Sequence, residues 1–118
     1  MGALTEQVGG NHYKELKMQP IVLIVKAGCD FIQGNIIKYV TRHRYKNGKE
    51  DINKCIHYAH LAMELLPEKR EYLNTGLAYS YALANSLTTE ETNVIVATLQ
   101  RDFLGVIQAC GVILKKEY

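Results

Sequence analysis

Hydrophobic residues in the middle of the chain recur with the period of an amphipathic α-helix. They fall on one side of two successive segments, and they are Ile32, Ile36 and Val40, then Ile52, Ile56, Ala59 and Met63. Asn47-Gly48 between the two sets is a turn dipeptide, with glycine at the position where a helix most easily ends. The pattern therefore predicts an antiparallel pair of helices over Gly34–Tyr45 and Glu50–Leu66.

Polar residues form one stripe on each of these two helices. Both stripes have the spacing i, i+3, i+7, and they consist of Asn35, Lys38 and Arg42, then Asp51, Lys54 and Tyr58. At about 100° per residue, each stripe occupies a narrow sector of its helix. Such a face is usually only solvated. The alternative is a site, because donors, a carboxylate and a ring on faces not needed for the core suit an anionic, partly aromatic ligand such as a nucleotide.

Two further segments between residues 20 and 87 have helical patterns. Pro20 suits the first turn of a short buried helix and Gly28 suits its end. Ile21–Val25 is β-branched enough to be a strand, but no second strand candidate lies nearby, so we favour a helix. Glu68–Leu87 repeats apolar residues at helical spacing, and Gly76 weakens that helix locally.

The C-terminal part predicts two more helices. Thr88 and Glu91 have the spacing of a capping box, which begins one helix. Asp102 is a candidate N-cap for the last helix, which extends to about Lys116. The chain is therefore expected to be all-α, a small bundle of five or six helices, and its sequence contains no evident internal repeat.

The last helix is apolar on nearly every side. Its apolar residues are Phe103, Leu104, Val106, Ile107, Ala109, Cys110, Val112, Ile113 and Leu114. A helix that is apolar on every side is stable only when all its faces are buried, and a small domain has little interior in which to bury them. We therefore expect a homo-oligomer that forms through residues 102–116.

Composition is that of one globular domain over residues 1–118. The chain is 47% hydrophobic and 22% charged, so disorder is not expected. Its formal net charge is only +2, which argues against a broad nucleic-acid surface. The short basic cluster of Arg42, Arg44, Lys46 and Lys49 could touch phosphates, but it belongs to no recognised nucleic-acid motif.

Several features favour a protein of the cytoplasm without membrane contact. Met1–Gly10 has no apolar run of the signal-peptide type, and the longest run, Ile21–Val25, is too short to cross a bilayer. The three cysteines, Cys29, Cys55 and Cys110, are widely spaced and odd in number. This pattern is typical of reduced cysteines and not of a disulfide framework.

Metal and phosphate chemistry have weak sequence support. His57 and His60 lie on one helix near Cys55, but no second cluster completes a zinc site. Glu64 and Glu68 have no acidic partner pair, so the carboxylate repeats of helical NTP pyrophosphohydrolases are absent. The chain also has no phosphate loop of the G-x-x-x-x-G-K-[ST] type. We therefore expect no metal and no cofactor.

The N-terminal segment carries a second polar group. It runs Gly9, Gly10, Asn11, His12, Tyr13, Lys14. Paired glycines allow the backbone to approach a ligand closely, and the polar residues can add contacts. A flexible N-terminal arm is the alternative interpretation.

These groups together resemble the signature of a small family that is mainly encoded by phages. The matching residues are Gly9–Lys14, Gln19-Pro20-Ile21, Gly34–Arg42, Lys46-Asn47-Gly48, Glu50-Asp51-Ile52, Lys54 and Tyr58. The family has been catalogued as a domain of unknown function and later as SaV-like. The resemblance covers about residues 8–66, whereas residues 67–118 carry no assigned motif.

The resemblance implies three competing functions. One branch of the family is described as a nucleotide kinase, which would need ATP and magnesium held by Asp51 or Glu50. Another branch interacts with a host abortive-infection protein, which implies an adaptor. Small phage proteins of similar size also include sponges for nucleotide immune signals, an analogy of class and not of motif. With no phosphate loop and little length for two pockets, we favour a sponge in the host cytoplasm that binds its ligand without turnover.

Specific roles follow for the candidate ligand-binding residues. Lys38, Arg42 and Lys54 are expected to contact phosphates, with Arg42 gripping two oxygens at once. Asn35 is expected to bond base or ribose, and Tyr39 or Tyr58 to stack on a base. His12, Tyr13 and Lys14 are expected to close over the ligand, and Gly9 and Gly10 allow their approach. Asn11 and Asp51 are further candidate ligand-binding residues.

Overall fold

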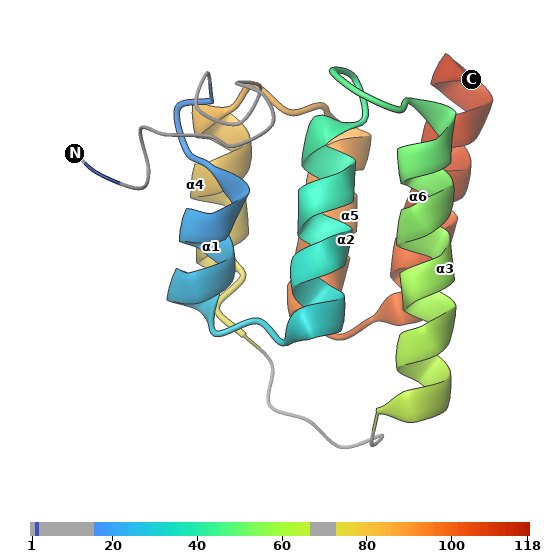
Figure 1. Cartoon of the computed structure of the whole chain (residues 1–118), viewed down its shortest axis with the longest axis horizontal. Coiled ribbons are helices and arrows are strands. Elements are labelled where there is room, and N and C mark those ends of the chain that lie inside the picture. The colour runs from blue at the N-terminus through green and yellow to red at the C-terminus, as the bar shows by residue number, and fades with distance from the viewer. Residues whose placement is uncertain (1, 3–15, 67–72) are drawn as a thin grey trace.

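The structure, a computed structural model, describes residue 2, residues 16–66 and residues 73–118 (Figure 1). Within these ranges the chain forms six α-helices and no strand, which confirms the all-α prediction. The helices are α1 (Pro20–Ala27), α2 (Phe31–Arg42), α3 (Lys49–Leu65), α4 (Gly76–Ala84), α5 (Thr89–Leu99) and α6 (Phe103–Glu117). None of them is long and apolar enough to cross a membrane.

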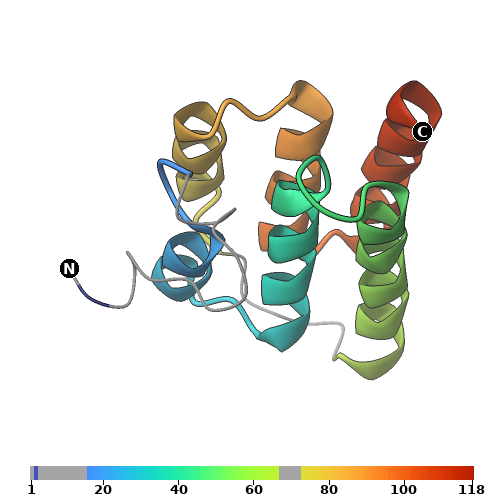
Figure 2. The same ribbon diagram turned by 45° about the horizontal axis from the view of Figure 1, so that its top comes forward.

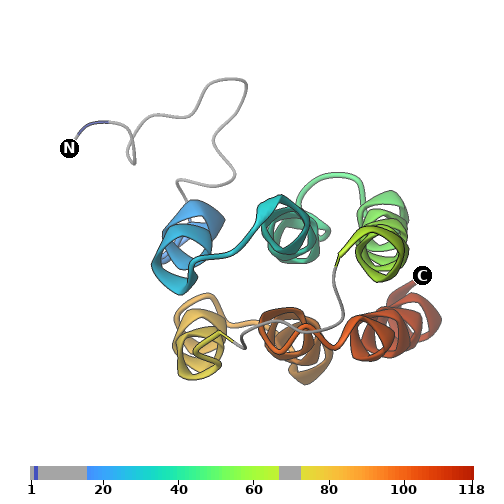
Figure 3. The ribbon, with the colours of Figure 1, turned by 90° about the horizontal axis from the view of Figure 1, so that it is seen from below.

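The six helices form two layers of three (Figure 3). One layer contains α1, α2 and α3 in that order, and the other contains α4, α5 and α6. Each helix packs on its counterpart across the layers, α1 on α4, α2 on α5 and α3 on α6 (Figures 1 and 2). The prediction that the second and third helices are antiparallel is confirmed, since α2 and α3 run in opposite directions side by side (Figure 1).

The two layers are related by an approximate two-fold rotation. Each helix in one layer runs opposite to its counterpart in the other (Figure 1). The helix lengths also correspond, with 8, 12 and 17 residues in α1, α2 and α3 and 9, 11 and 15 in α4, α5 and α6. The axis of this rotation passes between the layers, through the three helix pairs.

Local geometry repeats between the layers as well. Gly28 ends α1 with φ 73°, and Ser86, which is 58 positions later, follows α4 with φ 55°. Asp30 begins the capping box of α2, and Thr88, again 58 positions later, begins that of α5. The sequence has no evident internal repeat, whereas the structure repeats this local geometry between its two layers. Sequence could not show it, because two halves can share burial and turns while sharing few residue identities.

The core lies between the layers, where the apolar faces of the central helices meet. Ile36 and Ile37 of α2 are fully buried, as are Val94 and Ile95, which stand 58 positions later in α5. Burial of each such side chain contributes about 1.5–3 kcal/mol. Cys55 and Cys110 lie fully buried in the same core as free thiols, and Cys29 is a half-buried free thiol.

The turn between α2 and α3 differs from the sequence prediction. The predicted helix over Gly34–Tyr45 begins earlier and ends earlier, because Asp30 and Gln33 form a capping box that begins α2 at Phe31. Gly48 has φ 53° and is the N-cap of α3, so this glycine begins a helix where it was expected to end one.

Two more helices depart from their predicted form. α1 has the predicted Pro20 and Gly28 at its ends, but Ile21 and Val25 are 51% and 69% exposed, so only its inner face is buried. The helix predicted over Glu68–Leu87 begins at Gly76, and residues 67–72 lie outside the described part. A glycine at the first helical position explains why the helical pattern overran the true start.

The last helix begins after the predicted cap, since Asp102 accepts a hydrogen bond from the Gly105 amide at 2.9 Å. Most of its apolar residues are covered within the chain by α3 and α5, and Val106 is fully buried. Leu104 and Val112 remain 63% and 42% exposed. A homo-oligomer contact through residues 102–116 would therefore bury mainly these two apolar side chains. This apolar surface is smaller than the sequence indicated.

Candidate functional site

Three cationic side chains converge on one tyrosine ring. The ring centre of Tyr39 lies 4.7 Å from Lys38 Nζ, 4.6 Å from Arg42 Cζ and 5.0 Å from Lys54 Nζ. The first two cations come from α2 and the third comes from α3, so the predicted stripes meet across the helix pair. A tyrosine face attracts cations by about 0.5–1 kcal/mol each at such partly exposed positions. Together with Tyr58, these residues form what we term the tyrosine–cation cluster.

Aromatic rings continue the cluster along α3. Tyr58 stacks on Tyr39 with 6.0 Å between the ring centres and 17° between the planes. Phe31 meets the other side of Tyr58 edge-on at 6.4 Å and is 76% exposed. This row presents flat apolar surface beside positive charge, which is an arrangement suited to an aromatic ligand that carries phosphate.

Arg42 is held by a buried carboxylate. Its Nε and Nη2 atoms both donate to Asp51 at 3.3 Å, and Asp51 is fully buried. The backbone amide of Asn47 donates to the same carboxylate at 3.3 Å. The guanidinium edge of Arg42 that was predicted to bind two phosphate oxygens therefore binds Asp51 instead. Arg42 contributes to the cluster as an oriented positive charge.

The two lysines are the more accessible cations of the cluster. Lys54 pairs with Glu50 at 3.4 Å, but both side chains are exposed to solvent, at 37% and 67%. An exposed i, i+4 pair of this kind is worth about 0.3–0.5 kcal/mol, so it yields readily to a stronger anion. Lys38 has no carboxylate partner within the described ranges. Both ammonium groups can therefore turn toward an incoming phosphate.

An apolar pocket adjoins the cluster on the side of α1. It has a volume of about 140 Å³ and is lined by Gln19, Pro20, Ile21, Ile24 and Lys38. Lys38 thus lines the pocket and also contacts the Tyr39 ring. The positive cluster and an apolar recess are neighbours on one face of the molecule.

Asn35 occupies the predicted stripe, but its side-chain amide is already engaged. Asn35 Nδ2 donates to the backbone oxygen of Phe31 at 2.8 Å. This bond ties the amide to the first turn of α2, whereas Lys38 and Arg42 lie later in the same helix. The other predicted contacts, Gly9, Gly10, Asn11, His12, Tyr13 and Lys14, lie outside the described residues.

A second polar group, which sequence reasoning did not identify, joins the layers beyond the end of α2. Buried His43 contacts Glu91 with Nε2 at 2.5 Å and the Tyr118 hydroxyl with Nδ1 at 2.7 Å. Arg44 donates to Glu91 at 2.9 Å and pairs with Glu117 at 3.0 Å. The capping box identified Glu91, but nothing local in the sequence pairs it with a histidine 48 positions earlier.

Hydrogen bonds in this network favour the ionised form of Glu91. Burial would raise the pKa of Glu91, but hydrogen bonds from His43, the Thr88 amide and Arg44 outweigh it and lower that pKa to about 2. His43, Glu91 and Glu117 place ligand atoms within 4.8 Å of one another, as a metal site would. The Arg44 guanidinium already bridges the two carboxylates, so the group is a salt-bridge network. His57 and His60, the metal ligands considered from sequence, are exposed and stand apart from it.

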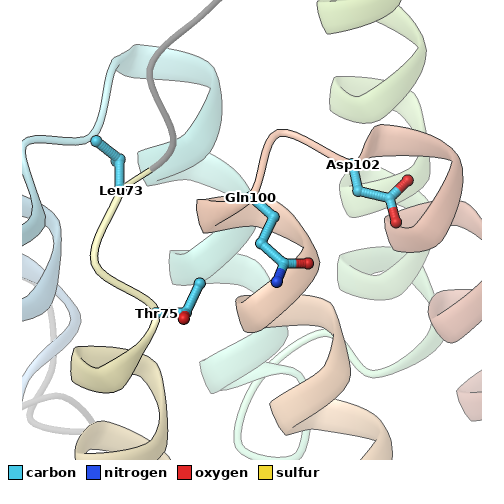
Figure 4. A pocket seen from close by; sticks show the side chains of 4 residues that line it. All are labelled: Leu73, Thr75, Gln100 and Asp102. Atoms are coloured by element: carbon cyan, nitrogen blue, oxygen red, sulfur yellow. The ribbon is translucent and has the colours of Figure 1, made fainter.

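A larger pocket of about 380 Å³ opens between the start of α4 and the turn that joins α5 to α6 (Figure 4). It is lined by Leu73, Thr75, Gln100 and Asp102. Among the residues that the structure describes, this lining offers one carboxylate and neither a cation nor an aromatic ring.

Comparison with known proteins found a family profile that matches part of the chain. Residues 8–60 match the profile of a family described as a protein of unknown function, DUF3310. The matched region contains all five residues of the tyrosine–cation cluster. No curated protein and no solved structure matches the chain.

Proposed function

We propose that this protein binds a nucleotide-derived small molecule at the tyrosine–cation cluster and holds it without turnover. The observation that carries the proposal is the convergence of Lys38, Arg42 and Lys54 within 5.0 Å of the Tyr39 ring centre. Three cations packed around one ring repel one another, and an anion placed among them would relieve that repulsion.

The ligand's two parts have separate places on this face. Phosphate oxygens would bond to Lys38 and Lys54, while Arg42 adds charge from its place beside Asp51. The flat part would lie in the apolar pocket beside α1 or against the Tyr58 ring, and Lys38 joins the two regions. Stacking on an aromatic side chain is worth about 1–3 kcal/mol per base.

The state of Asp51 favours binding over phosphoryl transfer. A nucleotide kinase holds magnesium with a carboxylate close to the transferred phosphate. Asp51 or Glu50 was predicted for that task, and Glu50 is exposed and pairs with Lys54 at 3.4 Å. The two oxygens of Asp51 accept hydrogen bonds from Arg42 and Asn47 in a fully buried position. Releasing Asp51 would break its ion pair with Arg42. This cost supports sequestration as the first choice and leaves the kinase as the alternative to test.

In biological terms, we propose that the ligand is a nucleotide signal of host antiphage defence. The support is the sequence resemblance to phage-encoded proteins together with a basic, ring-lined site. The host protein of an abortive-infection system remains the alternative partner.

A binding titration tests the chemistry directly. Purified protein is titrated calorimetrically with cyclic dinucleotides, cyclic oligonucleotides and nucleoside di- and triphosphates. We expect at least one to bind and Lys38→Ala and Lys54→Ala each to weaken it by roughly ten- to a hundredfold, the value of one charge-assisted hydrogen bond. Lys115→Ala, a matched loss of one exposed lysine on α6, should leave binding unchanged. Equal losses in all three variants would show a non-specific charge effect and refute the site.

A further inference from the structure

A groove runs between α5 and α6 on the face opposite the tyrosine–cation cluster. Its volume is about 370 Å³, within the range of small-molecule sites. It is lined by Asn93, Val96, Ala97, Gln100, Asp102, Gly105, Gln108, Ala109 and Val112. Gln100 and Asp102 also line the neighbouring pocket of Figure 4, so the groove is open at that end.

The groove is the two-fold counterpart of the tyrosine–cation cluster. Alignment of the first helical residues pairs α2 with α5 at a spacing of 58 positions and α3 with α6 at 54. Tyr39 then corresponds to Ala97 and Tyr58 to Val112, so small side chains stand where the two stacked rings stand in the other layer. The space filled by rings on one face is left open on the other.

The cations of the cluster are also replaced. Lys54 corresponds to Gln108 and Arg42 to Gln100, so amides stand in place of positive charges. Lys38 corresponds to Val96, which removes the third cation. The described lining of the groove therefore lacks both the rings and the positive charges of the cluster.

The remaining chemistry selects for an uncharged ligand. Ala97, Ala109 and the two valines give the groove apolar surface of the kind that contacts the face of a flat ring. Three side-chain amides, those of Asn93, Gln100 and Gln108, line it and make no side-chain hydrogen bond to any other residue the structure describes. Amides both donate and accept, so they match the mixed edge of a heterocycle. Asp102 places a carboxylate at one end, which disfavours phosphate.

We propose that the α5–α6 groove is a second small-molecule site, which binds an uncharged nucleobase or nucleoside. The proposal extends beyond the first site and does not depend on it, because the two sites share no residue. The chain would then carry a site on each of two faces that the two-fold rotation relates, one for a phosphorylated ligand and one for an uncharged ligand.

The test is methyl NMR of the whole chain with alanine and valine methyl groups labelled. Adenosine, guanosine, cytidine and uridine are the probes. We expect at least one to shift the methyl signals of Ala97, Ala109 and Val112 along a saturating curve. Gln108→Ala should weaken that binding about three- to tenfold, as the loss of one or two neutral hydrogen bonds does. Asn53→Ala, an exposed amide on α3, is the matched control and should have no effect.

Ala97→Tyr provides a second variant, because tyrosine is the residue at the corresponding position of the other layer. It should fill the groove and abolish the shifts, while phosphorylated ligands still bind at Lys38 and Lys54. The proposal is overturned if no nucleoside produces saturating shifts at its solubility limit, or if Gln108→Ala and Ala97→Tyr both leave them unchanged. Shifts of the same methyl groups on concentrating the protein alone would also overturn it, since the groove would then hold a second copy.

Discussion

The ring of Tyr39 on α2 stacks on the ring of Tyr58 on α3, with 6.0 Å between their centres and an interplanar angle of 17°. The stack bridges the two helices at the edge of the core, against which both partly buried rings pack. Three cations then gather around the Tyr39 ring. The two rings therefore both hold α2 and α3 together and form part of the proposed anion site.

The first prediction concerns Glu50, whose carboxylate pairs with Lys54 of the proposed site at 3.4 Å. Glu50→Gln removes a competing carboxylate, so an anionic ligand should bind more tightly by about twofold, the value of an exposed i, i+4 ion pair. Calorimetric titration at low salt measures this, and the gain should shrink as salt is raised. Weaker binding in Glu50→Gln would place the ligand away from Lys54.

The second prediction concerns Asp51. Asp51→Asn removes the carboxylate charge that pairs with the Arg42 guanidinium, whose side chain is only 11% exposed. We expect a loss of about 2–4 kcal/mol in the free energy of unfolding, since breaking a buried pair is costly. Urea denaturation followed by circular dichroism measures the change. Glu64→Gln on the same helix is exposed and should change stability by less than about 0.5 kcal/mol. Equal stability of the two variants would contradict the role given to Asp51.

The third prediction is a loss of stability in acid through Glu91. Its folded-state pKa of about 2 lies below the ordinary value of 4.5, so its contribution is complete above about pH 4.5 and is lost as pH falls toward 2. The difference corresponds to about 3 kcal/mol. Urea midpoints measured between pH 6 and pH 2 give the slope. Glu91→Gln should be less stable at pH 6 and should show a shallower decline, and an unchanged slope would show that other carboxyl groups cause the acid loss.

The fourth prediction separates stability from binding at Tyr81. The Tyr81 hydroxyl, fully buried on α4, is 2.7 Å from Thr41 Oγ1. Tyr81→Phe removes this hydrogen bond and should lower stability by about 1 kcal/mol. Ligand binding at the cluster should stay the same, because Thr41 faces the core and not the site. If Tyr81→Phe weakened binding by more than threefold, a change in the core would be shown to alter the tyrosine–cation cluster.

The amphipathic spacing of the sequence predicted much of the fold. Apolar residues at helical spacing located α2, α3 and the last helix, and the cap residues Thr88 and Asp102 predicted the starts of α5 and α6 correctly. The two polar stripes were also predicted to share a face, and the structure brings Lys38 and Lys54 to one ring. Local periodicity suffices for such features because each depends on residues only a few positions apart.

Other features depend on residues that are distant in sequence, and the sequence did not reveal them. The two-fold relation between the layers rests on burial and turn geometry, as at Gly28 and Ser86, and not on residue identity. The contact of His43 with Glu91 joins helices of different layers. The pairing of Arg42 with Asp51 likewise required the antiparallel register, and it changes the expected role of that arginine.

The most direct test of sequestration is mass spectrometry of what the protein carries. Protein is purified from phage-infected, defence-carrying cells, heated, and the released small molecules are identified, with the Lys38→Ala, Lys54→Ala double variant as control. We predict a phosphorylated nucleotide derivative that is released unchanged, is absent from the double variant, and remains intact when incubated with the wild-type protein, ATP and magnesium. Transfer of a phosphoryl group to that compound at catalytic rates, lost in Asp51→Asn, would contradict sequestration and establish the kinase instead.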